Sequence, residues 1–239
     1  GIAVAIVLLP ELARALKAGN DREASNLQNR SVEFSLFMTL PAAAALLVMS
    51  EPIVRVLYER GAFSQDDTAM VGSILAIFGL GLPAFVLIKA FTPGFFARED
   101  TRTPMIFAAI SVAINIALTL FPSMGAPGIA IASVVAGWAN AVLLFATLLR
   151  RRQWGRDVPL LTRIPRLVVA AALMALFVHF AVGWLSGWLA PASPLRHQAV
   201  ALGGLIGAAM LVYFAVAFAI GGADLGMLRR NLRRGGKRG

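Results

Sequence analysis

The chain is dominated by apolar runs that are long enough to cross a lipid bilayer, separated by short charged clusters. Hydrophobic residues make up 59% of its 239 residues and charged residues only 14%, whereas soluble domains are about 45–50% apolar and about 25% charged. A helix needs roughly 20 apolar residues to cross the hydrocarbon. We therefore predict an all-α, polytopic bundle of membrane helices. The predicted full spans cover residues 34–49, 69–97, 104–121, 128–149, 167–189 and 199–220.

The first nine residues are apolar but too few to cross a bilayer alone, so we expect them to be the second half of a helix that begins upstream. Within the spans, Pro41 predicts a kink. Thr103 is the expected N-cap of the span that starts at Pro104. Further expectations concern the connectors: a short interfacial helix within 51–68 that ends at Gly61, a tight turn at 122–127, a basic loop at 150–166 and a disordered basic tail at 229–239.

Lysine and arginine are distributed unevenly over the predicted connectors. Eighteen of the 22 lie in one alternate set, the other set has only Arg55, Arg60 and Arg196, and Lys89 lies within a span. Because basic residues are enriched in cytoplasmic loops, we expect the C-terminus to be cytoplasmic. The alternation also supports the number of spans.

Several classes of function are disfavoured by composition. The chain has no cysteine, which excludes disulfides and thiolate metal sites. Its net charge of +10 lies in short clusters between apolar spans, not in a stripe that could follow a nucleic-acid backbone, so we expect no nucleic-acid partner. No paired-carboxylate, P-loop or zinc-protease motif is present, and with two histidines hydrolytic catalysis is disfavoured.

The stretch from Gly81 to Pro104 has the most unusual order of residues. Lys89 lies inside an apolar span, and Pro83, Pro93 and Gly94 are expected to break the helix around it. Such breaks are tolerated in membranes where they face protein or a water-filled cavity. Lys89 could extend to the interface along its long stem, or it could line a cavity and attract an anionic substrate. We favour the cavity interpretation.

Charged residues at the two ends of this region suggest gates. Arg98, Asp100 and Arg102 follow the predicted break, and they could form a solvated helix end or a cytoplasmic gate. Glu59 and Arg60, on the opposite side, could form a periplasmic gate, although a structural role is the simpler interpretation because exposed ion pairs contribute little.

Asn115 and Thr119 lie four residues apart on one helix face. They could pair between helices, which we favour, or ligate a small cation. A sodium site usually includes a carboxylate, and this span has none. We expect no bound metal or cofactor.

Three segments occur in the order LPELARAL, LYERGAF and KAFTPGFFAREDTRTP, and with them the whole chain resembles the MurJ/MviN family of bacterial lipid II flippases. The resemblance implies two six-helix lobes and a terminal helix pair, related to multidrug exporters of the MATE type. It implies alternating access in the inner membrane, with lipid II or a similar polyprenyl-pyrophosphate glycolipid as the substrate. On this basis residues 1–155 would hold most of the second lobe, and 156–239 the terminal pair and a basic tail.

The resemblance also indicates what lies elsewhere. Gly1 would fall within the eighth helix, so the N-terminal half, with the arginines that bind pyrophosphate in the family, would be a missing partner. Lys89 alone matches as a cavity cation. Asn115 matches the neighbourhood of a family sodium site, but Thr119 stands where a carboxylate would help, which disfavours a sodium site here. The membrane potential or Na⁺ is the expected energy source. The last two spans would form an apolar groove for the polyprenyl tail.

Other functions remain open at this point. A MATE-type exporter of small molecules should have carboxylates within its spans, and no acidic residue lies deep in a predicted full span. An exporter of another polyprenyl-linked glycan and a membrane scaffold without transport activity are the further alternatives.

Overall fold

The computed structural model describes residues 2–120, 125–155, 158–190 and 193–222. Within these ranges the chain forms seven helices and no strand. Six of them, α2 to α7, are long and apolar enough to cross a membrane, which confirms the predicted fold class and the six full spans. The helices are α1 (Ile2–Lys17), α2 (Asp21–Tyr58), α3 (Gln65–Phe96), α4 (Arg102–Thr119), α5 (Gly125–Arg150), α6 (Val158–Trp184) and α7 (Leu195–Ala219).

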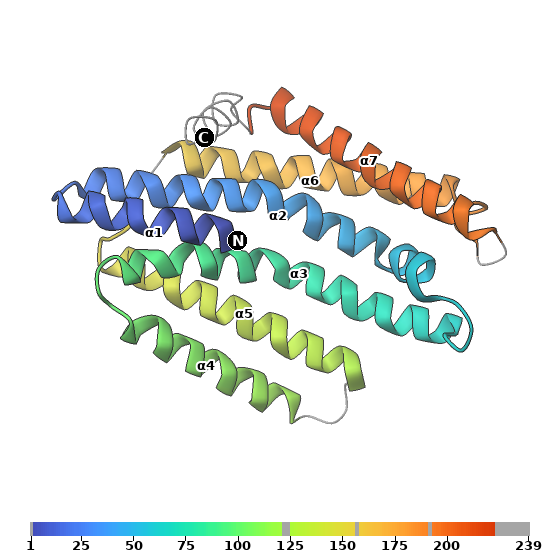
Figure 1. The fold of residues 1–239 in the computed structure, drawn as a ribbon, viewed down its shortest axis with the longest axis horizontal. Helices are drawn as coiled ribbons and strands as arrows, with labels where there is room; N and C mark the ends of the chain where they lie inside the picture. Colours follow the sequence, from blue (N-terminus) through green and yellow to red (C-terminus); the bar gives the residue numbers. More distant parts are fainter. Residues whose placement is uncertain (1, 121–124, 156–157, 191–192, 223–239) are drawn as a thin grey trace, which may run out of the picture.

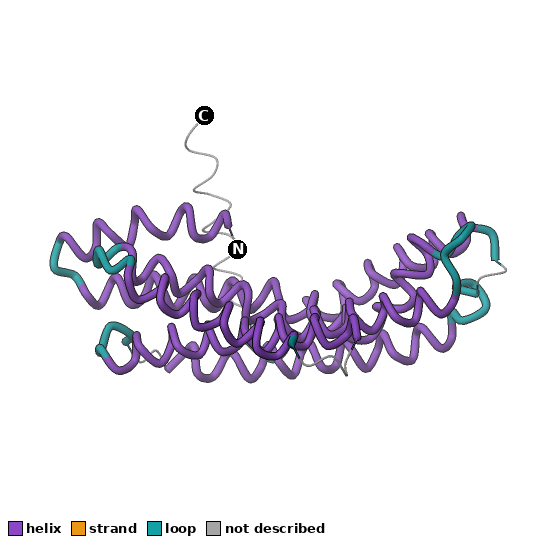
Figure 2. Tube along the Cα trace, turned by 90° about the horizontal axis from the view of Figure 1, so that it is seen from below, coloured by secondary structure: helices purple, strands orange, loops and turns teal. Residues whose placement is uncertain are grey.

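Six helices lie side by side in one layer, in the order α7, α6, α2, α3, α5 and α4 (Figure 1). The layer is bowed, and α1 lies on one of its faces against α2 and α3 (Figure 2). The α1–α2, α3–α4 and α5–α6 connectors meet at the same end of the layer (Figure 1). The basic residues of these connectors therefore gather at one end, as the alternation along the sequence predicts.

Two apolar clusters hold the layer together, and α2 contributes to both. One cluster joins α2 to α6 and α7, and it includes Phe37, Met174 and the fully buried Tyr213, whose hydroxyl donates to the Phe37 carbonyl at 2.8 Å. The other joins α2 to α3 and α5 and includes Leu36, Phe95 and other buried residues. Leu40 packs against both clusters. The 38-residue helix α2 is thus the shared support of the whole layer.

Helix α2 is longer than the predicted span because the polar flanks on both sides are helical. It begins after Asn20, whose side chain accepts from the backbone N–H of Glu23 at 3.1 Å, a typical N-cap contact. The expected kink at Pro41 is wrong: the non-helical residue is Met49, at φ −117° and ψ 18°. Pro52 follows three residues later, and a proline ring disturbs the preceding turn of a helix.

The expected interfacial helix in 51–68 is instead the end of α2, which stops at Tyr58. Gly61, at φ 61°, lies beyond that end in the connector. Helix α3 then starts at a capping box, in which Ser64 and Asp67 each accept from the other's backbone N–H.

The expected helix breaks at Pro83 and Pro93-Gly94 are not observed, because α3 continues through all three residues to Phe96. It ends in a Schellman turn, with the N–H of Asp100 donating to the Phe95 carbonyl at 3.0 Å. Glu99 occupies the left-handed position of this turn at φ 61°. A cap of this kind satisfies the last carbonyls of the helix, and α3 ends within one residue of the predicted end of the span at residue 97.

Two further helix starts differ from expectation. Helix α4 begins at Arg102, one residue before Thr103, so Thr103 is not the N-cap; Asp100 accepts from its N–H at 3.0 Å instead. The expected loop 150–166 is mostly helical, because α6 already begins at Val158. Part of the expected turn at 122–127 and the whole tail 229–239 lie outside the described residues.

Candidate functional site

Lys89 lies on an exposed stripe of α3. Within the described part of the chain its ammonium has no hydrogen bond or ion pair. Phe78 and Phe96, which are 38% and 43% exposed, lie on the same side of the helix about three turns before and two turns after it. The cation therefore faces away from both apolar clusters, between two aromatic side chains.

Gly94 allows a close approach between α3 and α2. A Cβ at this position would lie 2.3 Å from Nε2 of Gln28. The Gln28 side chain is fully buried and donates to the Phe91 carbonyl at 3.5 Å. Pro93 has no N–H to donate to the Lys89 carbonyl one turn earlier; the Gln28 bond goes to a neighbouring carbonyl of the same turn. At the other proline, Trp138 donates from Nε1 to the Leu80 carbonyl at 3.0 Å.

Two Schellman turns bring distant segments together at the basic end of the layer. The first ends α3, as described above. The second ends α5, with Arg152 in the left-handed position at φ 55° and the N–H of Gln153 donating to the Leu148 carbonyl at 2.9 Å. These turns place Arg98 and Asp100 opposite Arg151 and Gln153.

Asp100 is the centre of this contact. Its carboxylate accepts from the Thr103 hydroxyl at 2.7 Å and from Nη1 of Arg151 at 2.5 Å. The hydrogen bonds from Thr103, followed by the bond from Arg151, lower the pKa of Asp100 to about 2. Arg102 lies two residues after Asp100 in the sequence, but it is exposed and has no polar partner among the described residues. Of the three predicted gate residues, Asp100 and Arg98 thus contact the α5–α6 connector, and Arg102 does not.

Arg98 is held by backbone carbonyls. Its guanidinium donates to Gly94 at 2.7 Å and to Gln153 at 3.4 Å. Burial lowers the pKa of Arg98, and the charge of Asp21 acts in the opposite direction. Since arginine remains protonated in proteins, the carbonyls and Asp21 stabilise a cation at the junction of three connectors.

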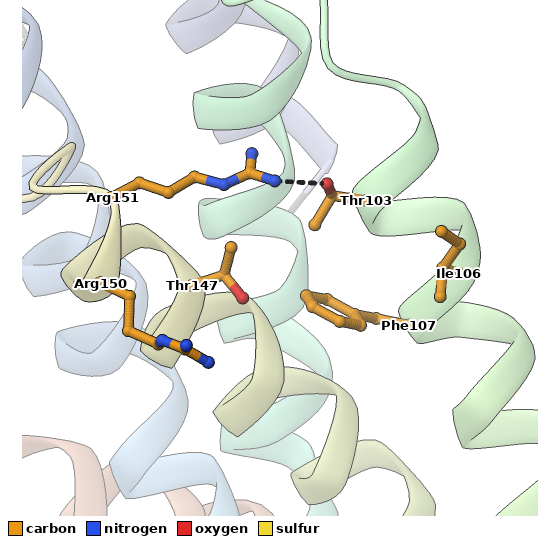
Figure 3. A pocket seen from close by; sticks show the side chains of 6 residues that line it. All are labelled: Thr103, Ile106, Phe107, Thr147, Arg150 and Arg151. Atoms are coloured by element: carbon orange, nitrogen blue, oxygen red, sulfur yellow. Dashed lines mark hydrogen bonds between the residues drawn. The ribbon is translucent and has the colours of Figure 1, made fainter.

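Two cavities open at this end of the layer. The first, of about 510 Å³, lies between α4 and α5, and Figure 3 shows its six lining residues. We call it the α4–α5 cavity; its lining residues are Thr103, Ile106, Phe107, Thr147, Arg150 and Arg151. The second, of about 680 Å³, has almost only polar lining residues: Asp21, Arg22, Ser25, Asn26, Asn29, Arg98, Arg151, Arg152, Gln153 and Gly155.

The charged residues at the opposite end have local partners. Glu59 accepts from the Thr68 hydroxyl at 2.8 Å and from Nε of Arg55 at 3.3 Å. Arg60 donates to the carbonyl of Val56, one turn earlier. These bonds tie the end of α2 to the start of α3, which favours the structural interpretation of this pair.

Asn115 and Thr119 do not converge on a shared point. The Asn115 amide donates to the Ser133 hydroxyl on α5 at 3.1 Å, whereas the Thr119 hydroxyl donates to the Asn115 carbonyl at 2.7 Å. These contacts favour pairing between helices. No group of three metal-ligating side chains occurs among the described residues.

Sequence reasoning missed one buried ion pair. Glu33 lies thirteen residues into α2, its side chain is 7% exposed, and it accepts from Nη1 of Arg163 on α6 at 2.8 Å. Glu33 lies one residue before the predicted span 34–49, in its polar flank. The neighbouring Val32 and Leu36, both buried, are the signal that could have identified it, because they continue the helical period across Glu33.

Comparisons with known proteins agree with this membrane architecture. The family model for lipid II flippase MurJ matches residues 1–197. A probable lipid II flippase MurJ from Rhizobium meliloti (strain 1021) is 72% identical over 98% of this chain, and one from Rhizobium tropici is 57% identical over the same share. A lipid II flippase MurJ from Burkholderia cenocepacia is 31% identical over 75% of the chain.

The chain covers only part of the length of each relative. The chain covers 44% of the length of each Rhizobium protein and 35% of the Burkholderia protein. The matched family model nevertheless spans most of the chain, and the structure is a multi-pass helical layer. The chain therefore belongs to the MurJ family of lipid II flippases.

Proposed function

We propose that this chain supplies part of a lipid II flippase that works by alternating access in the bacterial inner membrane. The observation that supports this most strongly is the 72% identity, over nearly the whole chain, to a probable lipid II flippase. Because the chain covers less than half of that relative, the remaining segment is its proposed partner. Residues 1–155 would form most of the second lobe, and 156–239 would contain the terminal helix pair.

Lys89 is the proposed contact of this chain with the anionic headgroup. An ionisable side chain on a spanning helix is costly if it faces lipid, and the exposed Lys89 has no partner in the described part of the chain. A cavity between this face of α3 and the remaining segment would satisfy the charge with water and substrate. The aromatic rings of Phe78 and Phe96 would form apolar walls on either side.

Orientation and energy follow from charge. We propose that the end of the layer with the basic connectors is cytoplasmic, because basic residues favour that side. Asp100 and Arg98 would then contribute to the cytoplasmic gate, and the exposed Arg102 would pair with the remaining segment. An inside-negative potential is worth about 2.3 kcal/mol per charge per 100 mV. It favours outward movement of an anionic lipid, so the membrane potential, or a sodium gradient, is the proposed energy source.

The test is a chimeric protein in which this chain replaces the segment that it matches in the Rhizobium meliloti relative. The chimera is expressed in cells depleted of their own flippase, and lipid II translocation is measured. Lys89→Ala should lower translocation about tenfold or more, since a charge-assisted contact is worth about 1.5–3 kcal/mol. Lys89→Arg should retain most of it, and Lys17→Ala, which removes an exposed lysine at the end of α1, is the matched control.

The two parts of the proposal fail separately. An intact chimera that reaches the membrane but translocates no lipid II would refute the proposed function. Full translocation by a Lys89→Ala chimera at normal expression would remove only Lys89 from the substrate path.

A further inference from the structure

Helix α4 forms one edge of the layer (Figure 1), and most of its residues are apolar. It packs mainly against α5 and has no buried residue. Met105, Val112 and Ile116 are each more than 50% exposed. The polar side chains of Ser111 and Asn115 bond to α5, so the faces of α4 that point away from α5 are apolar and suited to lipid. The α4–α5 cavity, at the basic end of this edge, is therefore open to a lipid leaflet.

The residues of the α4–α5 cavity follow the order of groups in a phospholipid. Arg150 and Arg151 lie at the end of α5, and Thr103 lies in the first turn of α4. Ile106 and Phe107 line the cavity about one turn deeper along α4, and the Phe107 ring points toward α5 (Figure 3). Cationic and hydroxyl groups thus occupy the headgroup level, and apolar side chains lie at the level where acyl chains begin.

Two donors in this cavity are unused. Arg151 already donates to Asp100 and to the Thr103 hydroxyl at 3.1 Å. Arg150 is exposed, and neither its guanidinium nor the Thr147 hydroxyl has a hydrogen-bond partner within the described ranges. Both come from the last turn of α5. An arginine and a hydroxyl together are a common donor set for phosphate oxygens.

We propose that the α4–α5 cavity binds the phosphate of an anionic glycerophospholipid, with Arg150 and Thr147 as donors. One acyl chain would lie along Ile106, which is 52% exposed. A free phosphate fits less well, because Ile106 and Phe107 line the cavity and would contribute nothing to binding a small anion. No residue that lines the neighbouring polar cavity has an aliphatic or aromatic side chain, so lipid recognition is assigned to the α4–α5 cavity.

The test measures lipid binding to the purified 239-residue chain in detergent by native mass spectrometry. Phosphatidylglycerol and phosphatidylcholine of identical acyl chains are added in turn, and the ratio of their bound fractions is the selectivity. Arg150→Gln should lower the selectivity about fivefold, since one basic residue near a membrane surface contributes about 1 kcal/mol. Arg30→Gln removes an exposed arginine of α2 that lines neither cavity, and it should change the selectivity less than twofold.

A second variant tests the apolar wall. Ile106→Ser should weaken the binding of both lipids and leave their ratio unchanged, because it alters the acyl contact and not the donors. Competitors identify the source of the phosphate: neither inorganic phosphate nor undecaprenyl phosphate at equal concentration should displace phosphatidylglycerol. Displacement by either one, equal binding of the two glycerophospholipids, or unchanged selectivity in folded Arg150→Gln would overturn the proposal.

Discussion

The close contact between α2 and α3 at Gly94 gives a quantitative prediction. In Gly94→Ala the new Cβ would lie 2.3 Å from Nε2 of Gln28, and 2.9 Å from its Cδ and Oε1. Optimal contacts between such atoms are about 3.5 Å or longer, so the whole amide must move by about 1 Å. Gln28 is fully buried and cannot swing into solvent. Overpacking of this kind costs about 1–3 kcal/mol.

The helix propensity of alanine opposes this cost by up to about 1 kcal/mol, so a control is needed. Gly203→Ala provides it, because Gly203 lies within α7 and a Cβ there meets no atom within 4 Å. Thermal unfolding of both variants is measured in the same detergent. At about 2–4 °C per kcal/mol for a chain of this size, Gly94→Ala should unfold about 2–12 °C below Gly203→Ala.

A double variant shows whether Gln28 is the cause. In a Gln28→Ala background the side-chain amide is absent, so Gly94→Ala should no longer be destabilising. The lost hydrogen bond to Phe91, at 3.5 Å, is long and contributes little. Equal unfolding temperatures for Gly94→Ala and Gly203→Ala, or the same effect of Gly94→Ala with and without Gln28, would refute the steric reasoning.

Two other contacts give predictions about pH and charge. The folded-state pKa of Asp100, about 2, is below its ordinary value of 3.8. Its contact with Arg151 should therefore be fully present above pH 4 and lost as pH falls through about 2. NMR titration of the carboxyl checks this, and a midpoint near 3.8 would contradict it. Glu33→Ala should destabilise by about 2–3 kcal/mol, less than for a fully buried pair because the Arg163 side chain is 25% exposed. Thermal unfolding measures this loss, Arg163→Leu in the same chain should restore part of it, and a neutral Glu33→Ala would contradict the ion-pair assignment.

The number and type of helices could be predicted because they depend on one property, the length of apolar runs. Helix ends could not, because they depend on single hydrogen bonds. The Asp100 carboxylate accepts the Thr103 N–H at the start of α4, where Thr103 was the expected cap, and the capping box of Ser64 and Asp67 starts α3 four residues before the predicted span. The polar first turns of α2 resemble a connector in sequence, because helical backbone bonds continue beyond the hydrocarbon without any apolar signal.

The candidate site was predictable in its residue types and not in its contacts. Lys89 is conspicuous in sequence because a charge in an apolar run is rare. The partner of Asp100 is Arg151, which lies 51 residues away in the sequence. Arg151 is one of several arginines in a basic cluster, so the sequence does not single it out. Gln28 meets the turn of Pro93 only because α2 and α3 cross where Gly94 has no side chain. Such pairings follow from tertiary packing, which the local pattern does not encode.

The shared position of α2 has a mechanical consequence. Leu40 and its neighbours on α2 contact both apolar clusters. The terminal pair α6–α7 therefore cannot tilt independently of α2 without separating the residues of one of the two clusters. Any rocking movement that reorients α2 must therefore move α6 and α7 with it. The pair α6–α7 would then change its angle to the bilayer in step with the rest of the molecule, with no hinge of its own.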